Sequence, residues 1–258
     1  MTQNDFMGVR WWPFGRSGGF DGVPDRPGLA ASPPRGIRHA PEAAAEARWV
    51  KETVSQGSGL TVAHFVPPVF EAYARLLRPT QGGRRWADIA AQRGIRLTAT
   101  TRYEDITRLD VDDPDEGSLS AAEGAVVAEV LRSFTASPER CLFLVGGGVT
   151  EDDWFGDLLF GGSRHVVLTG DVLAVTALAM DPFGPEFGIP AEAWPIAAEA
   201  WWPVDRSWFV YTNPDGFDTH LGGSAIAMEA LIGDDRIEVL PIGPDDEVDI
   251  SPEWGRPD

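Results

Sequence analysis

One short segment of the sequence gathers most of the side chains that could bind a ligand. It contains Trp201, Trp202, Asp205, Arg206 and Trp208. Aromatic faces beside a carboxylate and a guanidinium are groups that bind a sugar, a peptide or a cation. The same pattern also fits a structural role, in which the indoles fill the core and the charged pair stabilises a turn. We predict a ligand-binding or partner-binding site at these five residues, with a packed aromatic turn as the alternative.

A second group of candidate residues is the acidic loop Asp110–Glu116, which crowds carboxylates together. An EF-hand loop alternates oxygen ligands for calcium, but Pro114 stands where the third of these ligands belongs. Neither Cys141, which is the only cysteine, nor the histidines have the spacing of a zinc site. We therefore predict a solvated acidic loop, no metal and no other cofactor.

Groups for covalent catalysis are scarce. Lys51 is the only lysine, and Val50 rather than a glycine precedes it, which excludes a phosphate-binding loop. Cys141 lies in an apolar run, where burial raises the thiol pKa. No serine stands in the strand-to-helix motif of the hydrolase nucleophile. We predict no catalytic residue, and we keep a carboxylate-dependent hydrolase of a small or sugar-like substrate as the alternative.

The composition excludes several further classes of protein. The 258 residues carry 21 Lys and Arg against 40 Asp and Glu, a formal net charge of −19. Such a chain repels nucleic acid. It has no apolar run of the length of a membrane span. Its first residues lack the apolar region of a signal peptide, so we expect no secretion by that route. We expect a cytoplasmic protein that binds neither nucleic acid nor membrane.

The charge and the loop-forming residues divide the chain into three parts. Residues 1–57 are rich in Gly and Pro and carry seven basic and six acidic residues, which predicts a flexible segment with a short Ala-rich helix near 41–54. A misassigned start codon is an alternative origin for this segment. Residues 58–243 form the predicted acidic domain. Residues 244–258, with six acids and Arg256, are predicted to be disordered.

Several helices are predicted within the domain. The clearest begins at Ser120, because Ser120 and Glu123 form a capping box before apolar residues that recur at helical spacing. Further helices are expected at Val69–Arg78 and Trp86–Arg93, and at Ala225–Ile232 after the cap Ser224. Asp171–Met180 fits a helix or a strand, and we favour a helix because of the Asp cap and the alanines.

The strands complete the predicted fold. Three short apolar runs are typical of central strands, namely Cys141–Val145, His165–Thr169 and Trp208–Thr212. Thr61–Val66 and Ile237–Ile242 are expected to form two more. Because strands and helices do not alternate strictly, we predict an α+β fold, a single domain with a mainly antiparallel sheet and helices packed against it.

Parts of the chain resemble a group of actinobacterial hypothetical proteins to which no activity is assigned. The resemblance rests on PPVFEAYARLLRP (67–79), RRWADIAAQRG (84–94), CLFLVGGG (141–148) and WWPVDRSWFVYTNPDGFDTHLGGS (201–224). It carries no catalytic residue to this chain. The layout of the last third is similar to that of SUKH-type immunity and interaction domains.

These observations favour a non-catalytic binding protein. An acidic surface suits a basic protein partner, and neutralisation of a toxin is one form of this hypothesis. The hydrolase stays the alternative, and a structural subunit of an assembly is a third hypothesis. The oligomeric state is left open by the sequence.

Overall fold

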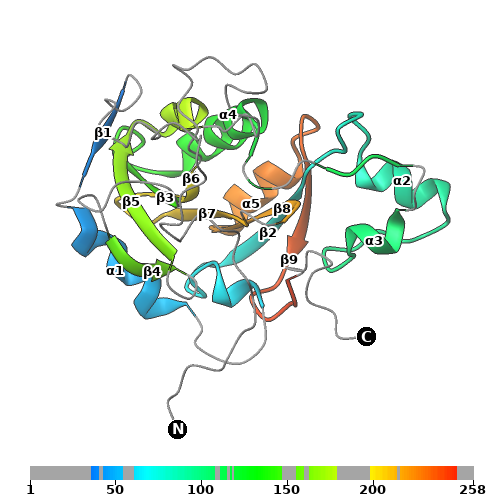
Figure 1. The fold of residues 1–258 in the computed structure, drawn as a ribbon, viewed down its shortest axis with the longest axis horizontal. Coiled ribbons are helices and arrows are strands. Elements are labelled where there is room, and N and C mark those ends of the chain that lie inside the picture. The colour runs from blue at the N-terminus through cyan, green and yellow to red at the C-terminus, as the bar shows by residue number, and fades with distance from the viewer. Residues whose placement is uncertain are drawn as a thin grey trace, which may run out of the picture.

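The fold is built on one antiparallel sheet (Figure 1). A computed structural model describes residues 36–40, 43–54, 61–107, 111–114, 117, 119–146, 155–159, 163–178, 198–213 and 216–248. The nine strands within these residues are β1 (Ile37–His39), β2 (Ala72–Leu77), β3 (Cys141–Gly146), β4 (Phe155–Leu159), β5 (Ser163–Gly170), β6 (Ala198–Pro203), β7 (Trp208–Thr212), β8 (Asp218–Gly223) and β9 (Glu238–Ile242). Their order is β1-β5-β3-β6-β7-β8-β2-β9, and β4 also pairs with β5.

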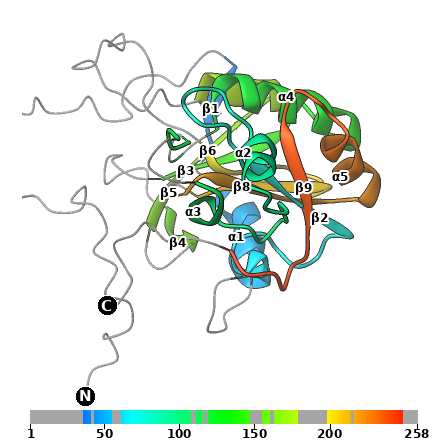
Figure 2. The same ribbon diagram turned by 90° about the vertical axis from the view of Figure 1, so that its right-hand side faces the viewer.

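Helices cover both faces of this sheet. They are α1 (Ala44–Thr53), α2 (Trp86–Gln92), α3 (Tyr103–Ile106), α4 (Ala121–Leu131) and α5 (Ala225–Ile232), with the 3-10 helices η2 (Val62–His64), η3 (Arg132–Phe134) and η5 (Val172–Leu178). Figure 2 shows α4 on one side of the sheet and α1 on the other. One apolar cluster joins the sheet to α4, α5 and η5, and a second joins the opposite face to α1 and η2. The α+β prediction is therefore confirmed.

The helix predicted from the capping box is α4. The Ser120 hydroxyl accepts a hydrogen bond from the backbone N–H of Glu123, and a Glu123 carboxylate oxygen lies 3.1 Å from the Ser120 backbone nitrogen. These two bonds satisfy backbone donors that lack partners in the first helical turn. Val127 and Leu131 then bury one face of the helix against the sheet.

Most of the other predicted elements are also present. The three apolar runs form β3, β5 and β7, and both faces of β3 and β7 are buried. The helices α2 and α5 and the strand β9 lie where they were predicted. The helix predicted at Asp171–Met180 is the 3-10 helix η5 as far as Leu178, and the last two residues of that prediction lie outside the described residues.

Two predicted elements have a different secondary structure from the one expected. Val69–Arg78 was predicted to be a helix, but Ala72–Leu77 is strand β2. Both faces of β2 are buried, so its apolar residues recur at helical as well as strand spacing.

Thr61–Val66 was predicted to be a strand, but it contains η2, whose first turn is closed by a hydrogen bond from the Thr61 N–H to Nδ1 of His64.

Two described parts of the segment before residue 58 are ordered on the sheet, in a region whose composition predicted a flexible chain. Residues 37–39 pair with β5 as strand β1, and residues 44–53 form α1. Trp49 and Val50 of α1 are buried in the second apolar cluster. The predicted short helix is thus α1, and the apolar face of α1 explains why it packs on the sheet. The predictions for 1–35 and 249–258 lie outside the described residues.

The strands β6 and β8 were not predicted. β6 begins with small residues, and β8 contains His220 and ends at Gly222 and Gly223. Gly222 is required by a close approach: a Cβ at this position would lie 2.5 Å from Cδ2 of Phe70 and 2.9 Å from Cγ1 of Val66. A glycine pair that indicates a turn in the sequence therefore permits close packing within a strand.

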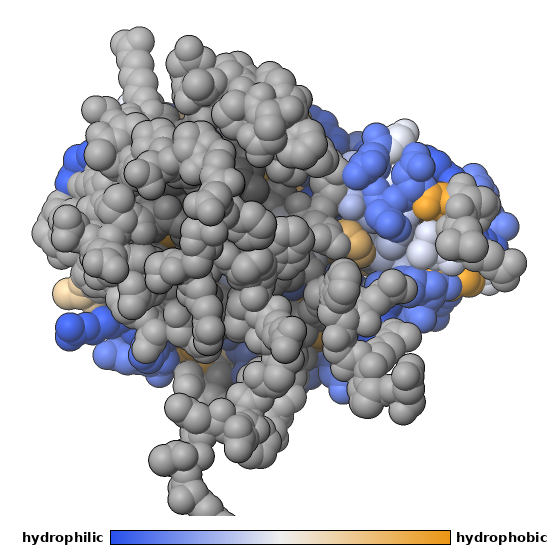
Figure 3. Space-filling model, viewed as in Figure 1, coloured by the Kyte–Doolittle hydropathy of each residue, from blue (hydrophilic) through white to orange (hydrophobic). Residues whose placement is uncertain are grey.

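The surface around α2 and α3 is largely hydrophilic, with small separate apolar spots (Figure 3). Within the described part of the chain, no helix is both long enough and apolar enough to cross a bilayer.

Replacing Gly222 by alanine is expected to destabilise the protein by about 1–3 kcal/mol, because the added methyl group forces Phe70 and Val66 apart. Chemical denaturation of Gly222→Ala measures this loss. Gly124→Ala in α4 is the control, since its Cβ would lie 3.8 Å from Val175, an ordinary contact. The control is expected to be neutral or more stable by about 0.5–1 kcal/mol. Equal stability of the two variants would contradict the packing argument.

Candidate functional site

The three predicted tryptophans lie in the core, on opposite faces of the sheet. Trp201 and Trp208 pack edge to face, with ring centroids 5.2 Å apart, in the cluster beneath α4 and α5. Trp202 points to the other face, where its ring centroid lies 6.0 Å from that of Trp49 in α1. All three are at most 1% exposed. The structure therefore gives these indoles a packing role and does not bring them together as one aromatic surface.

Asp205 and Arg206 form the exposed turn between β6 and β7. The Asp205 carboxylate accepts hydrogen bonds from the Thr135 hydroxyl at 2.7 Å, from the Ala136 N–H at 2.7 Å and from the Ser207 N–H at 3.1 Å. Partial burial raises the pKa of Asp205, but these hydrogen bonds outweigh it and hold that pKa below its usual value. The carboxylate thus ties this turn to the loop that leads into β3.

Arg206 connects the same turn to α1. Its backbone lies in the left-handed region, with φ of 56°, which is uncommon for a residue other than glycine. Its guanidinium carbon lies 5.0 Å from the ring centroid of Trp49, a cation–π contact. The turn is therefore held against two elements, and the binding role predicted for the five residues stays a prediction.

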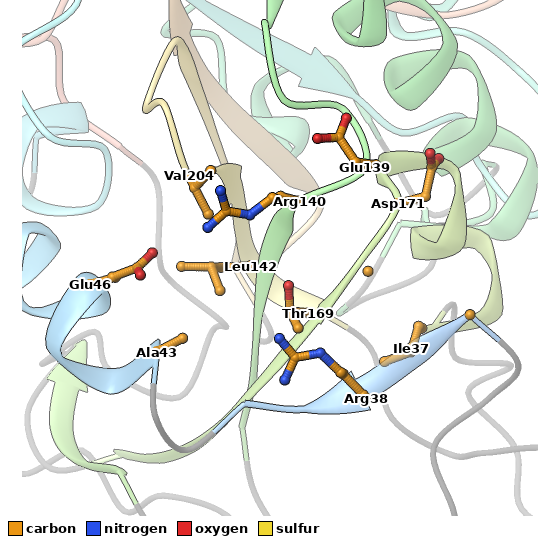
Figure 4. A pocket seen from close by; sticks show the side chains of 12 residues that line it. Ile37, Arg38, Ala43, Glu46, Glu139, Arg140, Leu142, Thr169, Asp171 and Val204 are labelled. Atoms are coloured by element: carbon orange, nitrogen blue, oxygen red, sulfur yellow. The ribbon is translucent and has the colours of Figure 1, made fainter.

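The turn also borders a pocket of about 590 Å³, which is within the size range of small-molecule sites. Val204, the residue before Asp205, forms part of its wall (Figure 4). The other lining residues come from β1, α1, β3 and β5 and from the residues that flank these elements: Gly36, Ile37, Arg38, Ala43, Glu46, Glu139, Arg140, Leu142, Thr169, Gly170 and Asp171. The predicted segment thus supplies Val204 to the pocket lining, and its turn contacts α1 and the loop before β3, which also border the pocket.

Charged side chains of both signs line the pocket. Glu46 of α1 and Arg140 point toward one another across the cavity in Figure 4. Glu46, Glu139 and Arg140 are exposed, and within the described residues none of their side chains has a hydrogen bond or an ion pair. Asp171 is engaged elsewhere, because its Oδ1 accepts a hydrogen bond from the Leu173 N–H. The pocket therefore offers the Glu46 carboxylate and the Arg140 guanidinium to a ligand, whereas Glu139 lies on the other side of Arg140, near Asp171 (Figure 4).

Sequence reasoning did not find these residues. Glu46, Glu139 and Arg140 stand in segments without a motif, and Glu46 approaches Arg140 because β1 and β3 both pair with β5. Only Val204, which adjoins the predicted Asp205–Arg206 pair, connects the sequence prediction to the residues that line the pocket. A strand order that joins such distant segments is needed before the pocket can be recognised.

A second polar group is buried at the other end of the sheet. Nε of Arg75 in β2 donates to Oδ2 of Asp218 in β8 at 2.6 Å. The Arg75 guanidinium also donates to the carbonyl oxygens of Ala99 and Thr101, at 2.6 and 2.9 Å. Its carbon lies 5.4 Å from the ring centroid of Trp86. Arg75 thus joins two strands, a loop and α2 in one contact network.

His220 lies next to this ion pair, with its Nε2 3.9 Å from Oδ2 of Asp218. Burial lowers the pKa of His220 to about 4, although the carboxylate opposes this shift, so the imidazole is neutral near pH 7. Burial raises the pKa of Asp218, but the charges of Arg75, His220 and Arg78 and the hydrogen bond from Arg75 together outweigh burial, so the net shift of this pKa is downward. Among the described residues, neither ring nitrogen of His220 has a hydrogen-bond partner.

The other candidate groups give no further site among the described residues. Burial raises the pKa of the Cys141 thiol, as predicted, and nearby carboxylates add to the shift. No cluster of His, Cys, Asp and Glu in the described part of the chain is arranged to hold a metal ion. In the acidic loop, Asp112 and Asp113 are exposed, whereas Asp110, Asp115 and Glu116 lie outside the described residues.

Comparisons of this chain with protein-family models, with curated proteins and with solved structures found no match. The resemblances to actinobacterial hypothetical proteins and to SUKH-type domains therefore stay predictions that rest on the segments quoted above.

Removing the buried guanidinium is expected to destabilise the protein by about 3–5 kcal/mol, because Asp218 is then left buried without its partner. Chemical denaturation of Arg75→Met measures this loss. Arg48→Met is the matched control: Arg48 is exposed on α1, and its loss is expected to change stability by less than about 0.5 kcal/mol. Similar losses in the two variants would show that the ion pair does not hold the strands.

The buried imidazole is expected to make stability depend on pH. The unfolded chain binds a proton at His220 below about pH 6.5, whereas the folded protein does so only near pH 4. The free energy of unfolding should therefore fall between pH 6.5 and 4, by up to about 1.4 kcal/mol per pH unit. Denaturant titrations of the protein and of His220→Gln across this range measure the effect. An unchanged slope in His220→Gln would contradict it.

Proposed function

We propose that this protein is a non-catalytic binding protein of the cytoplasm that recognises a basic protein partner. The pocket beside the β6–β7 turn is the proposed contact site. One observation carries the proposal: Glu46 and Glu139 line one open pocket and have no ion pair within the described residues. A basic side chain of a partner would supply the missing counter-charge.

The charge of the whole chain supports this proposal. A net charge of −19 attracts a basic protein over distances comparable to the Debye length and speeds the encounter. Exposed carboxylates then pair with the partner at short range. A protein that neutralises a basic toxin, as immunity proteins do, would use the same electrostatics.

The proposal is tested with an octa-arginine peptide whose two ends are capped, titrated calorimetrically at low salt. The double variant Glu46→Gln, Glu139→Gln is expected to weaken binding about tenfold or more, because two charge-assisted contacts are lost. The matched control is Glu229→Gln, Glu247→Gln, which removes two exposed carboxylates outside the pocket. Equal weakening by the two double variants would mean that only net charge matters and would contradict a site at the pocket.

The hydrolase stays a second candidate, because Glu46 and Glu139 place two carboxylates in one cavity. Incubation with chromogenic glycosides and esters distinguishes it. Turnover that is lost in Glu46→Gln or Glu139→Gln, with the fold intact by circular dichroism, would favour the enzyme over the binding protein.

A further inference from the structure

Arg140 is held in a position where it can contact a ligand. Its carbonyl oxygen accepts a hydrogen bond from the Val204 N–H at 3.0 Å, and its own N–H donates to the Ser137 carbonyl at 3.0 Å. The backbone is therefore fixed on both sides, while the exposed side chain has no hydrogen bond or ion pair among the described residues. In Figure 4 the guanidinium points into the cavity, above Leu142.

A second guanidinium lines the same cavity. Arg38 of β1 stands opposite Thr169 of β5, and Thr169 stands opposite Leu142 of β3. These three side chains therefore share one face of the sheet and form a row along the floor of the pocket. Arg38 and Arg140 thus bring positive charge to the floor, and Glu46 brings negative charge from α1.

This mixture of charges restricts the ligand. A ligand that carries positive charge alone leaves Arg140 unpaired, and a simple anion leaves Glu46 unpaired. A ligand that carries a carboxylate and a cation a few bonds apart satisfies both groups. The guanidinium forms two parallel hydrogen bonds with a carboxylate, which gives this contact direction as well as strength.

We infer that the pocket binds a basic residue whose α-carboxylate is free, with the carboxylate on Arg140 and the side-chain cation at Glu46. This inference rests on the proposed function, because it uses the Glu46 carboxylate for the cation. The chemistry is shared by the C-terminal Arg or Lys of a protein and by free arginine or lysine. The cavity of about 590 Å³ is large enough for one such residue.

The test compares peptides that differ only at the C-terminus. One peptide ends in arginine with a free carboxylate, a second has the same sequence with a C-terminal amide, and free arginine is the third probe. Calorimetry should show that amidation weakens binding about tenfold or more, because it removes the charged acceptor of Arg140. Free arginine that binds as tightly as the free-acid peptide would assign the site to an amino acid, and weaker binding would assign it to a chain end.

A double-mutant cycle tests whether the effect of amidation on binding depends on Arg140. In Arg140→Met the free-acid and amide peptides should bind equally, whereas Arg48→Met, which alters an exposed arginine outside the pocket, should keep the tenfold preference. Thermal unfolding checks that each variant is folded, and the comparison of peptides on the unmodified protein needs no variant.

The outcomes separate the two proposals. If the amide peptide binds as tightly as the free acid and Glu46→Gln, Glu139→Gln weakens both, recognition of the carboxylate is wrong and the proposed function stands. If neither peptide nor the capped octa-arginine binds, both proposals are wrong. If Arg140→Met weakens both peptides equally and keeps their ratio, Arg140 does not contact the carboxylate and the inference is overturned.

Discussion

The ion pair between Arg75 and Asp218 is the contact on which one half of the molecule depends. It joins β2 to β8 inside the sheet, and the same guanidinium holds the loop at residues 99–101 and lies over Trp86 of α2. Two charges that are almost fully buried remain stable only if both are paired and hydrogen-bonded. The small cluster of α2 and α3 is therefore attached to the sheet by polar contacts as well as by apolar packing.

The strongest electrostatic interactions and the proposed binding groups lie at opposite ends of the strand order. Arg75, Asp218 and His220 belong to β2 and β8, whereas the pocket lies beside β1, β5 and β3. Perturbed pKa values often indicate a functional site, but a buried ion pair in a sheet perturbs them equally well. In this protein the proposed binding site uses exposed charges, whereas the paired and buried charges stabilise the fold.

The sequence predicted the elements whose pattern is local and missed those that depend on distant contacts. The capping box of Ser120 is complete within four residues, so α4 was correct. Strand β2 was mistaken for a helix because Arg75, a charge in the middle of a buried strand, conceals the strand pattern until Asp218 is placed beside it. At the candidate site, the turn at Asp205 could be predicted from local residues, whereas Glu46 and Arg140 become neighbours only through the pairing of β1 and β3 with β5.

The placement of the indoles on both faces of the sheet has a spectroscopic consequence. Trp201 and Trp208 lie in the layer with α4 and α5, while Trp202 contacts Trp49 in the layer with α1. Intrinsic fluorescence of the protein thus contains signals from both layers. Trp49 follows Glu46 by about one helical turn and lies beneath Arg206. Among these four indoles, Trp49 and Trp202 are therefore the ones whose emission would change on occupation of the pocket, and Trp201 and Trp208 would provide an internal reference.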